Sequence, residues 1–245
     1  MYFQRMDALP EDVRELVRSL YRRDPLTYVY LFNDLVDEEE GVASGLTLQG
    51  SSILQEYRGM RRRDLLLYGD GVELVSGYFD TLQTFNTSRL DELEHKVGLG
   101  RVPFLDMTCR SPRVVGDARR LTPADAPAYF SFIRSVWRRG DNVERTSRYL
   151  ERRVVYGSFE GKELVSVAEA YVTLPEVWVV GGVFTLPSFR GRGHAKAVTS
   201  AVAAHASRNG ATTLLHVRED NEPAVRAYED VGFEVLRRRW WFLRQ

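Results

Sequence analysis

Hydrophobic positions three and four residues apart open the chain and predict a helix. They are Leu9, Val13, Leu16, Val17 and Leu20, and a second apolar segment follows at residues 28–36. Between residues 44 and 79 the pattern changes to short apolar runs, such as 65–68 and 72–75, separated by the tight-turn residues Gly69-Asp70-Gly71. These runs predict strands, so the first part of the chain is expected to form a small α+β domain.

After residue 112 the pattern restarts and alternates strands with helices. Thr122-Pro123-Ala124-Asp125 contains the residues that begin a helix: an N-cap Thr, a Pro at the first helical position and an acidic residue at the third. Strands are expected at 114–121, 154–159, 164–173, 177–186 and 213–217, followed by a terminal strand pair. Helices are expected at about 122–137, 143–152 and 223–231, and an Ala-rich helix is expected after the loop 190–195, ending at 209–210. Glycine and proline at 98–103 and 111–112 predict connecting chain, which divides the sequence into domains of residues 1–111 and 112–245.

Formal charge adds an asymmetry to this picture. The 245 residues include 34 Lys+Arg and 34 Asp+Glu, but residues 1–111 hold 13 basic and 19 acidic side chains, whereas residues 112–245 hold 21 and 15. The overall balance argues against a nucleic-acid-binding protein, and the asymmetry indicates an anionic partner for the second domain. The cluster Arg237-Arg238-Arg239-Trp240-Trp241 mixes basic and aromatic residues, as nucleic-acid surfaces do. Because no net basic domain face is evident around it, we interpret it as a closing strand with Arg side chains outward and Trp inward.

Composition predicts a folded, cytoplasmic protein that does not bind membranes. Hydrophobic residues make up 44% of the chain. The N-terminal residues are charged throughout, and no segment approaches the roughly 18 apolar residues of a membrane-spanning helix. Cys109 is the only cysteine and cannot form an internal disulfide. The histidines lack zinc-site spacing, so we expect no metal; they are His95, His194, His205 and His216.

A glycine loop between a predicted strand and a predicted helix is the main candidate for a ligand site. Gly191 and Gly193 let the backbone approach a ligand with no side chain between them. The first N–H groups of the helix point out of its end, where the helix dipole favours negative charge. Arg190, Arg192 and Lys196 add positive charge, so we expect a polyphosphate here. The spacing matches neither G-x-G-x-x-G nor G-x-x-x-x-G-K-[ST].

Two motifs resemble those of the GCN5-related N-acetyltransferase (GNAT) superfamily. Residues 190–195 fit the signature [QR]-x-x-G-x-[GA], and residues 182–187 resemble the strand that leads into it. Residues 221–233 resemble the segment N-x-x-A-x-x-x-Y-x-x-x-G-F, and residues 120–125 resemble the family's first strand and helix start. The resemblance covers residues 112–245 and implies a mixed, mostly antiparallel sheet flanked by helices. The smaller α+β domain before it is expected to be non-catalytic, and one interpretation makes it a degenerate copy of the same fold.

The resemblance also implies an activity, namely direct transfer of the acetyl group of acetyl-CoA to a primary amine in a ternary complex. The loop amides would bind the pyrophosphate, and the preceding strand would pair with the pantetheine arm. An N–H near Phe184 would bind the developing oxyanion. A splay of this strand from the next, with a bulge at Gly181-Gly182, would make room for the arm. The implied cofactor-binding residues are Val183, Phe184, Thr185, Arg190, Gly191, Arg192, Gly193, His194, Ala195 and Asn221.

For proton transfer, the resemblance implies that Tyr228 is the general acid. Asn221 lies seven residues earlier, on the same side of the last predicted helix, and either caps that helix or contacts CoA. Glu169, between two alanines in a predicted strand, is the first candidate for the general base, and Glu176 competes with it.

Several alternatives stay open. A longer acyl group could replace acetyl, and a non-catalytic acyl-CoA sensor would have the same loop. The expected partners are acetyl-CoA and an amine acceptor of undetermined identity, without nucleic acid. A homodimer is one open possibility for the assembly.

Overall fold

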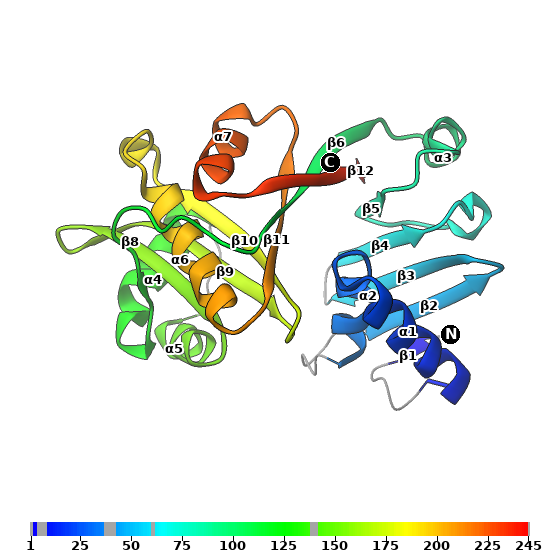
Figure 1. Ribbon diagram of the computed structural model, residues 1–245, viewed down its shortest axis with the longest axis horizontal. Helices are drawn as coiled ribbons and strands as arrows, with labels where there is room; N and C mark the ends of the chain where they lie inside the picture. Colours follow the sequence, from blue (N-terminus) through cyan, green and yellow to red (C-terminus); the bar gives the residue numbers. More distant parts are fainter. Residues whose placement is uncertain (1, 4–8, 37–42, 60–61, 138–141, 245) are drawn as a thin grey trace. The chain divides into compact units, whose positions relative to one another are not determined.

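The computed structural model describes residues 2–3, 9–36, 43–59, 62–137 and 142–244 (Figure 1). The chain is α+β and divides into two compact units. Unit 1 comprises Met1–Asp106, Arg218–Asp220 and Arg237–Gln245, and unit 2 comprises Met107–Val217 and Asn221–Leu236. Strands β6 (Arg101–Cys109) and β12 (Glu234–Leu243) therefore have residues in both units. In the described ranges no helix is both long and apolar enough to cross a membrane.

In its described residues, unit 1 is a sheet with three α-helices. Its strands follow the order β1-β2-β3-β4-β5-β12, and all neighbouring pairs are antiparallel except the parallel pair β4–β5. The helices are α1 (Glu11–Arg23), α2 (Pro25–Val36) and α3 (Leu90–Val97). The strands are β1 (Tyr2–Phe3), β2 (Ala43–Gln49), β3 (Ser52–Gly59), β4 (Arg62–Tyr68) and β5 (Thr81–Thr84).

Two expectations for this unit are wrong. Residues 72–75 do not form a strand, because Val72–Leu74 is a 3-10 turn (η2) that buries Val72 and Val75, three residues apart, on one side. Residues 98–103 are not simply connecting chain, since β6 begins at Arg101. Proline lacks only the N–H donor, and the Pro103 carbonyl still accepts a hydrogen bond from the Glu219 N–H at 3.0 Å.

The last strand buries an arginine that the alternation pattern placed outside. Arg239 and Asp106 are both fully buried. Arg239 binds the two Asp106 carboxylate oxygens at 2.9 and 3.0 Å, and its third nitrogen donates to Gln83 at 3.0 Å. Arg237 also donates to Asp106, at 2.9 Å. The outward orientation expected for the arginines is therefore wrong for Arg239, because a buried carboxylate supplies its counter-charge.

Unit 2 is a mixed, mostly antiparallel sheet with helices on both faces. Its strands follow the order β11-β10-β9-β8-β7, of which only the pair β10–β11 is parallel. The strands are β7 (Arg119–Arg120), β8 (Val154–Glu160), β9 (Glu163–Thr173), β10 (Val177–Thr185) and β11 (Thr212–Arg218). The helices are α4 (Ala126–Trp137), α5 (Val143–Arg152), α6 (His194–Arg208) and α7 (Glu222–Val231).

The two faces of this sheet are distinguished by neighbouring residues of β8. Val155 packs in one core cluster with residues of α4 and α5. Tyr156 faces the other way, and its ring lies 6.0 Å from His205 of α6. His205 also lies 4.9 Å from the ring of Trp178 and is half-buried. Burial lowers the His205 pKa.

Three local expectations for residues 112–245 need correction. The expected strand at 114–121 is reduced to Arg119–Arg120, because Gly116 has a φ of +64° and turns the chain. The capping box between Thr122 and Asp125 is present, but the first turn is a 3-10 turn (η3, Pro123–Asp125) before α4 begins. The expected terminal strand pair is the single strand β12, since no Gly, Pro, Asn or Asp breaks the run.

Candidate functional site

Strand β10 separates from β11 halfway along its length. The two strands pair from Val177↔Thr212 to Val180↔Leu215, and the described residues show no pair beyond that point although β10 continues to Thr185. The register against β9 shifts between Gly181 and Phe184, which adds one residue to β10 and forms a β-bulge. Residues 181–185 therefore have one edge without a strand partner in the described chain. The splay and the bulge expected from the sequence are both present.

The glycine loop follows this edge and opens helix α6. Gly191 and Gly193 have φ values of +76° and +86°, and a Cβ on either would meet no atom within 4 Å. Gly193 is the N-cap residue and offers no side chain to the helix, whose first intrahelical bond joins the Ala197 N–H to the Gly193 carbonyl at 3.0 Å. The N–H groups of residues 194–196 therefore have no partner within α6. Open space and free donors at the positive end of a helix are what an anion site requires.

Two arginines of the loop lie against aromatic rings and have no carboxylate partner in the described chain. The Arg190 guanidinium lies 5.5 Å from the centre of the Phe184 ring, and that of Arg192 lies 5.3 Å from the centre of the Phe189 ring. Both arginines are exposed. Their charges are therefore available to an anion at the loop.

Side-chain contacts connect the first turn of α6 to its surroundings. The His194 ring lies between β8 residues, with Nδ1 3.0 Å from the Ser158 hydroxyl and Nε2 3.2 Å from a Glu160 carboxylate oxygen. Lys196 pairs with Asp230 of α7 at 3.2 Å. His194 therefore offers a ligand its backbone N–H, while its ring orients the start of the helix.

Glu169 lies beside the bulge, on the sheet face covered by α4 and α5. One of its carboxylate oxygens, Oε2, accepts a hydrogen bond from the Tyr149 hydroxyl at 2.5 Å. The other, Oε1, is 3.2 Å from the point where a Cβ on Gly182 would stand. Burial raises the pKa of the Glu169 carboxyl, and the Tyr149 hydrogen bond and the Arg153 charge oppose this rise. A carboxyl with a raised pKa is suited to accept a proton near neutral pH.

Helix α7 carries the other two predicted residues. Tyr228 is buried, and this burial raises the pKa of its phenol to about 12. Its hydroxyl has no hydrogen-bond partner among the described residues. Asn221 occupies the N-cap position, where its carbonyl accepts from the N–H groups of Ala224 and Val225 at 3.0 Å. Its exposed side chain forms no cap bond, so the side-chain cap considered for Asn221 is absent and its amide is left for another partner.

The competing carboxylate, Glu176, lies at the other end of β10. It immediately precedes that strand, and its carbonyl accepts from the Thr212 N–H at 2.9 Å. At about 3.3 Å per residue, Glu176 is about 20 Å along the strand from Gly182. Of the two candidates, only Glu169 therefore lies beside the bulge.

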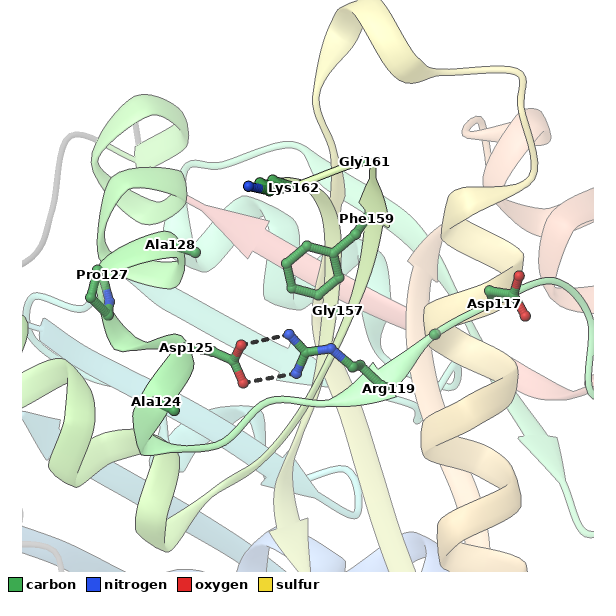
Figure 2. Close-up of a pocket in the computed structure, with 11 residues that line it drawn as sticks. Asp117, Arg119, Ala124, Asp125, Pro127, Ala128, Gly157, Phe159, Gly161 and Lys162 are labelled. Carbon is green, nitrogen blue, oxygen red and sulfur yellow. Dashed lines mark hydrogen bonds and ion pairs between the residues drawn. The ribbon is translucent and has the colours of Figure 1, made fainter.

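A cavity of about 720 Å³ lies between β7, the start of α4 and the β8–β9 turn (Figure 2). On its wall Arg119 binds Asp125 through two hydrogen bonds of 2.6 and 2.9 Å and lies 4.4 Å from the centre of the Phe159 ring. The hydrogen bonds from Arg119 lower the pKa of Asp125 to about 2. Lys162, on the β8–β9 turn, is exposed at this cavity. None of the predicted site residues lines the cavity.

Sequence reasoning missed the side chains that hold the predicted ones in place. Tyr149 is 20 residues from Glu169, and Ser158 is 36 residues from His194. No motif joins either pair, because the contacts depend on how α5 and α6 pack on the sheet. The amphipathic pattern of residues 143–152 was the one available signal for Tyr149, and it predicted only a helix.

No group of three or more His, Cys, Asp and Glu side chains that could hold a metal ion occurs within the described ranges. That a metal has no role stays a prediction.

Comparison with known families and structures gives one family match. The model of the family "FR47-like protein" matches residues 155–242, which run from β8 into β12 and include the glycine loop. No curated protein is similar enough in sequence to count as a match.

Solved structures match a larger part of the chain. A GCN5-related N-acetyltransferase-like protein from Streptococcus suis has a TM-score of 0.62 at 16% identity, covering 94% of this chain and 99% of its own. A GCN5-related N-acetyltransferase from Sphaerobacter thermophilus has a TM-score of 0.58 at 16% identity, covering 88% and 84%. An acetyltransferase of the GNAT family from Colwellia psychrerythraea has a TM-score of 0.52 at 16% identity, covering 83% and 85%. The fold predicted from the sequence, a mixed and mostly antiparallel sheet flanked by helices as in GNAT proteins, is confirmed.

Proposed function

We propose that this chain, which has the GNAT fold, is an N-acetyltransferase. It would move the acetyl group of acetyl-CoA directly to a primary amine in a ternary complex. One observation carries this proposal: beyond Val180, β10 has an edge that pairs with no strand in the described chain, and this edge runs from the bulge into the open glycine loop. A ligand with an extended arm and a polyphosphate fits two such adjoining surfaces. Bound acetyl-CoA would supply an activated acetyl thioester.

The loop residues suit the pyrophosphate of this cosubstrate. The backbone of residues 191–195 provides donors at the positive end of α6, and the exposed guanidinium groups of Arg190 and Arg192 provide charge. The open space around the two glycines is what a phosphate needs to reach the backbone. We assign the side chain of Asn221, which forms no bond in the described chain, to the same ligand.

The edge of β10 that lies beside no strand in the described chain suits the amide-containing arm, which would add to the sheet as an extra strand. The backbone of Val183, Phe184 and Thr185 is assigned to this pairing. Thr185 is fixed from the β9 side, because its hydroxyl lies 2.8 Å from that of Ser166. The N–H near Phe184, next to the bulge, is assigned to the developing oxyanion.

Proton transfer is assigned to two residues whose burial suits the task. Glu169 accepts a proton from the attacking ammonium, directly or through water, and its raised pKa brings it closer to neutral pH. Tyr228, with a pKa of about 12, stays protonated at neutral pH and donates its proton to the departing thiolate.

A screen of primary amines with acetyl-CoA tests the function, with thiol release and mass spectrometry of the product as readouts. We expect thiol release with at least one amine.

Tyr228→Phe removes the proposed proton donor, so we expect a kcat about 100-fold lower than that of the wild type. CoA affinity, measured by calorimetry, should not change. Tyr156→Phe, which removes a phenol that faces α6, is the matched control and should keep the wild-type kcat.

Two results would contradict the proposal. Tight CoA binding without thiol release for any amine would replace it with an acyl-CoA sensor. Faster transfer from a longer acyl-CoA would keep the enzyme and change the acyl group.

Substituting Gly193 of the glycine loop tests the pyrophosphate site. Gly193→Ala places a methyl group in the space assigned to a phosphate, so we expect the Kd for CoA, measured by calorimetry, to rise at least tenfold. Gly210→Ala is the matched control, because Gly210 lies at the other end of α6 with a φ of +78° and equally open surroundings. Both variants should lose about 1 kcal/mol of stability, because alanine is strained in the left-handed backbone conformation of these glycines. Equal CoA affinity in the two variants would remove the loop from the site.

Other parts of the assignment stay predictions. All the groups named above lie in residues 112–245, which we propose as the acetyltransferase domain. We propose that residues 1–111 form a non-catalytic domain, and its interpretation as a degenerate copy of the fold stays a hypothesis. The proposed partners are acetyl-CoA and an amine. A cytoplasmic location and the exclusion of nucleic acid stay predictions, and a homodimer stays one open possibility.

A further inference from the structure

The two oxygens of the Glu169 carboxylate have different surroundings. Oε2 accepts the hydrogen bond from Tyr149 at 2.5 Å, whereas Oε1 faces Gly182, which has no side chain to cover it. The carboxylate is thus held through one oxygen while the other lies toward the bulge. From this geometry we infer that Tyr149 is a positioning residue for Glu169, which keeps Oε1 directed at the reacting groups. The inference rests on the proposed function, in which Glu169 is the general base.

Tyr149 is itself held in place by α4 and α5. Its ring stacks on that of Tyr129, with the ring centres 6.2 Å apart and the planes 14° from parallel. The helix that carries it is capped by Asn142, whose side chain accepts from the Arg145 N–H at 2.8 Å, and Leu150 anchors it in the core. Tyr149 keeps 37% of its surface exposed, so the stack and the hydrogen bond to Glu169, rather than burial, hold the hydroxyl against the carboxylate.

The charged and titratable groups that act on Glu169 come from both helices. Tyr149 and Arg153 lie on and just after α5, and Tyr129 lies on α4; β10 contributes only Gly182 to this contact. Arg153 donates to the Tyr171 carbonyl at 2.8 Å, so its guanidinium is fixed by the backbone of β9. Burial and, after it, the negative charge of Glu169 raise the pKa of both tyrosines, which stay neutral at ordinary pH.

The hydrogen bond has a second effect, on the proton affinity of the base. A phenol that donates to a carboxylate stabilises its ionised form, so Tyr149 opposes the effect of burial on Glu169. Loss of this hydroxyl would therefore leave a carboxylate that is both less well oriented and more readily protonated. The first effect lowers kcat at every pH, and the second moves the acidic limb of the rate profile to higher pH.

The test uses the full-length protein and two variants. For Tyr149→Phe we expect kcat to fall about tenfold, with little change in the KM for the amine. This loss is a part of the roughly 10²–10⁴-fold rate increase that a general base contributes. The acidic limb of kcat/KM should move to higher pH. Tyr129→Phe is the matched control, because it keeps the ring stack and removes a neighbouring hydroxyl that does not bond to Glu169.

A second measurement does not depend on turnover. Carbon-13 NMR of protein labelled at the glutamate carboxyl groups, with the Glu169 resonance assigned from Glu169→Gln, gives the titration midpoint of this group directly. We expect a higher midpoint in Tyr149→Phe and the wild-type midpoint in Tyr129→Phe.

The outcomes separate the two claims. The inference alone would be overturned if the wild-type protein is active and the wild type, Tyr149→Phe and Tyr129→Phe all show the same Glu169 titration midpoint and the same acidic limb of kcat/KM. A wild-type protein that transfers no acyl group to any amine would overturn the proposed function, and the inference with it.

Discussion

Asp106→Ala is expected to destabilise the protein by about 3–5 kcal/mol, because it leaves Arg239 charged and without its counter-ion in a fully buried site. Arg237, which shares the same carboxylate, loses a partner as well. Urea denaturation monitored by tryptophan fluorescence measures the loss as a lower midpoint.

Two further variants separate a buried charge from general damage to the fold. Asp220→Ala removes the carboxylate of an exposed pair with Arg218 and should leave the midpoint unchanged. Asp106→Leu combined with Arg239→Met replaces the buried pair by apolar groups and should lose less stability than the two single variants added together. Losses that simply add would show that Asp106 and Arg239 act independently.

Glu169→Gln should lower kcat by about 10²–10⁴, because the amide cannot accept the proton of the attacking ammonium. CoA binding should be unchanged, since Glu169 is assigned no contact with the loop. Glu163→Gln, at the exposed start of the same strand, is the matched control and should keep full activity. Steady-state rates of thiol release measure both. A Glu169→Gln protein with wild-type kcat would exclude Glu169 as the base.

The same variant has a consequence for pH dependence. Because the Glu169 pKa is raised, the wild-type rate should fall on acidification at a pH above that of an ordinary glutamate, whose value is 4.5. The folded protein holds this proton more tightly than the unfolded chain does. Glu169 therefore adds stability at low pH, and this contribution is lost as the pH rises through the folded-state pKa. Glu169→Gln should remove that part of the pH dependence.

Local patterns were sufficient to predict the part of the fold that carries the glycine loop. The helix expected at 143–152 is α5, and the expected strands 154–159 and 164–173 differ from β8 and β9 by one residue at one end. Each of these segments has a clear period and a capping or turn residue at its ends, such as Asn142 before α5 and Gly161 in the turn after β8.

The failures occur where contacts distant in sequence outweigh local preference. Glycine and proline in residues 98–103 read as connecting chain, but β6 begins at Arg101, includes Pro103 and lies next to β12 from the end of the sequence. Arg239 lies inward because Asp106 is buried beside it, 133 residues away in sequence. The contact between Tyr149 and Glu169 needs a helix and a strand to pack face to face. No window of local sequence contains both members of such a pair.

The split of β12 between the units has a consequence for how the protein is made. Residues 237–245 belong to unit 1 but follow all of unit 2 in the chain. Domains generally fold one after another as they leave the ribosome, beginning at the N-terminus. Here the first 106 residues emerge without the arginines that Asp106 requires, so the unit synthesised first is the last to be completed. A ribosome that stalls before residue 237 would release a chain whose N-terminal unit cannot finish folding, and such products should be recognised by chaperones and proteases.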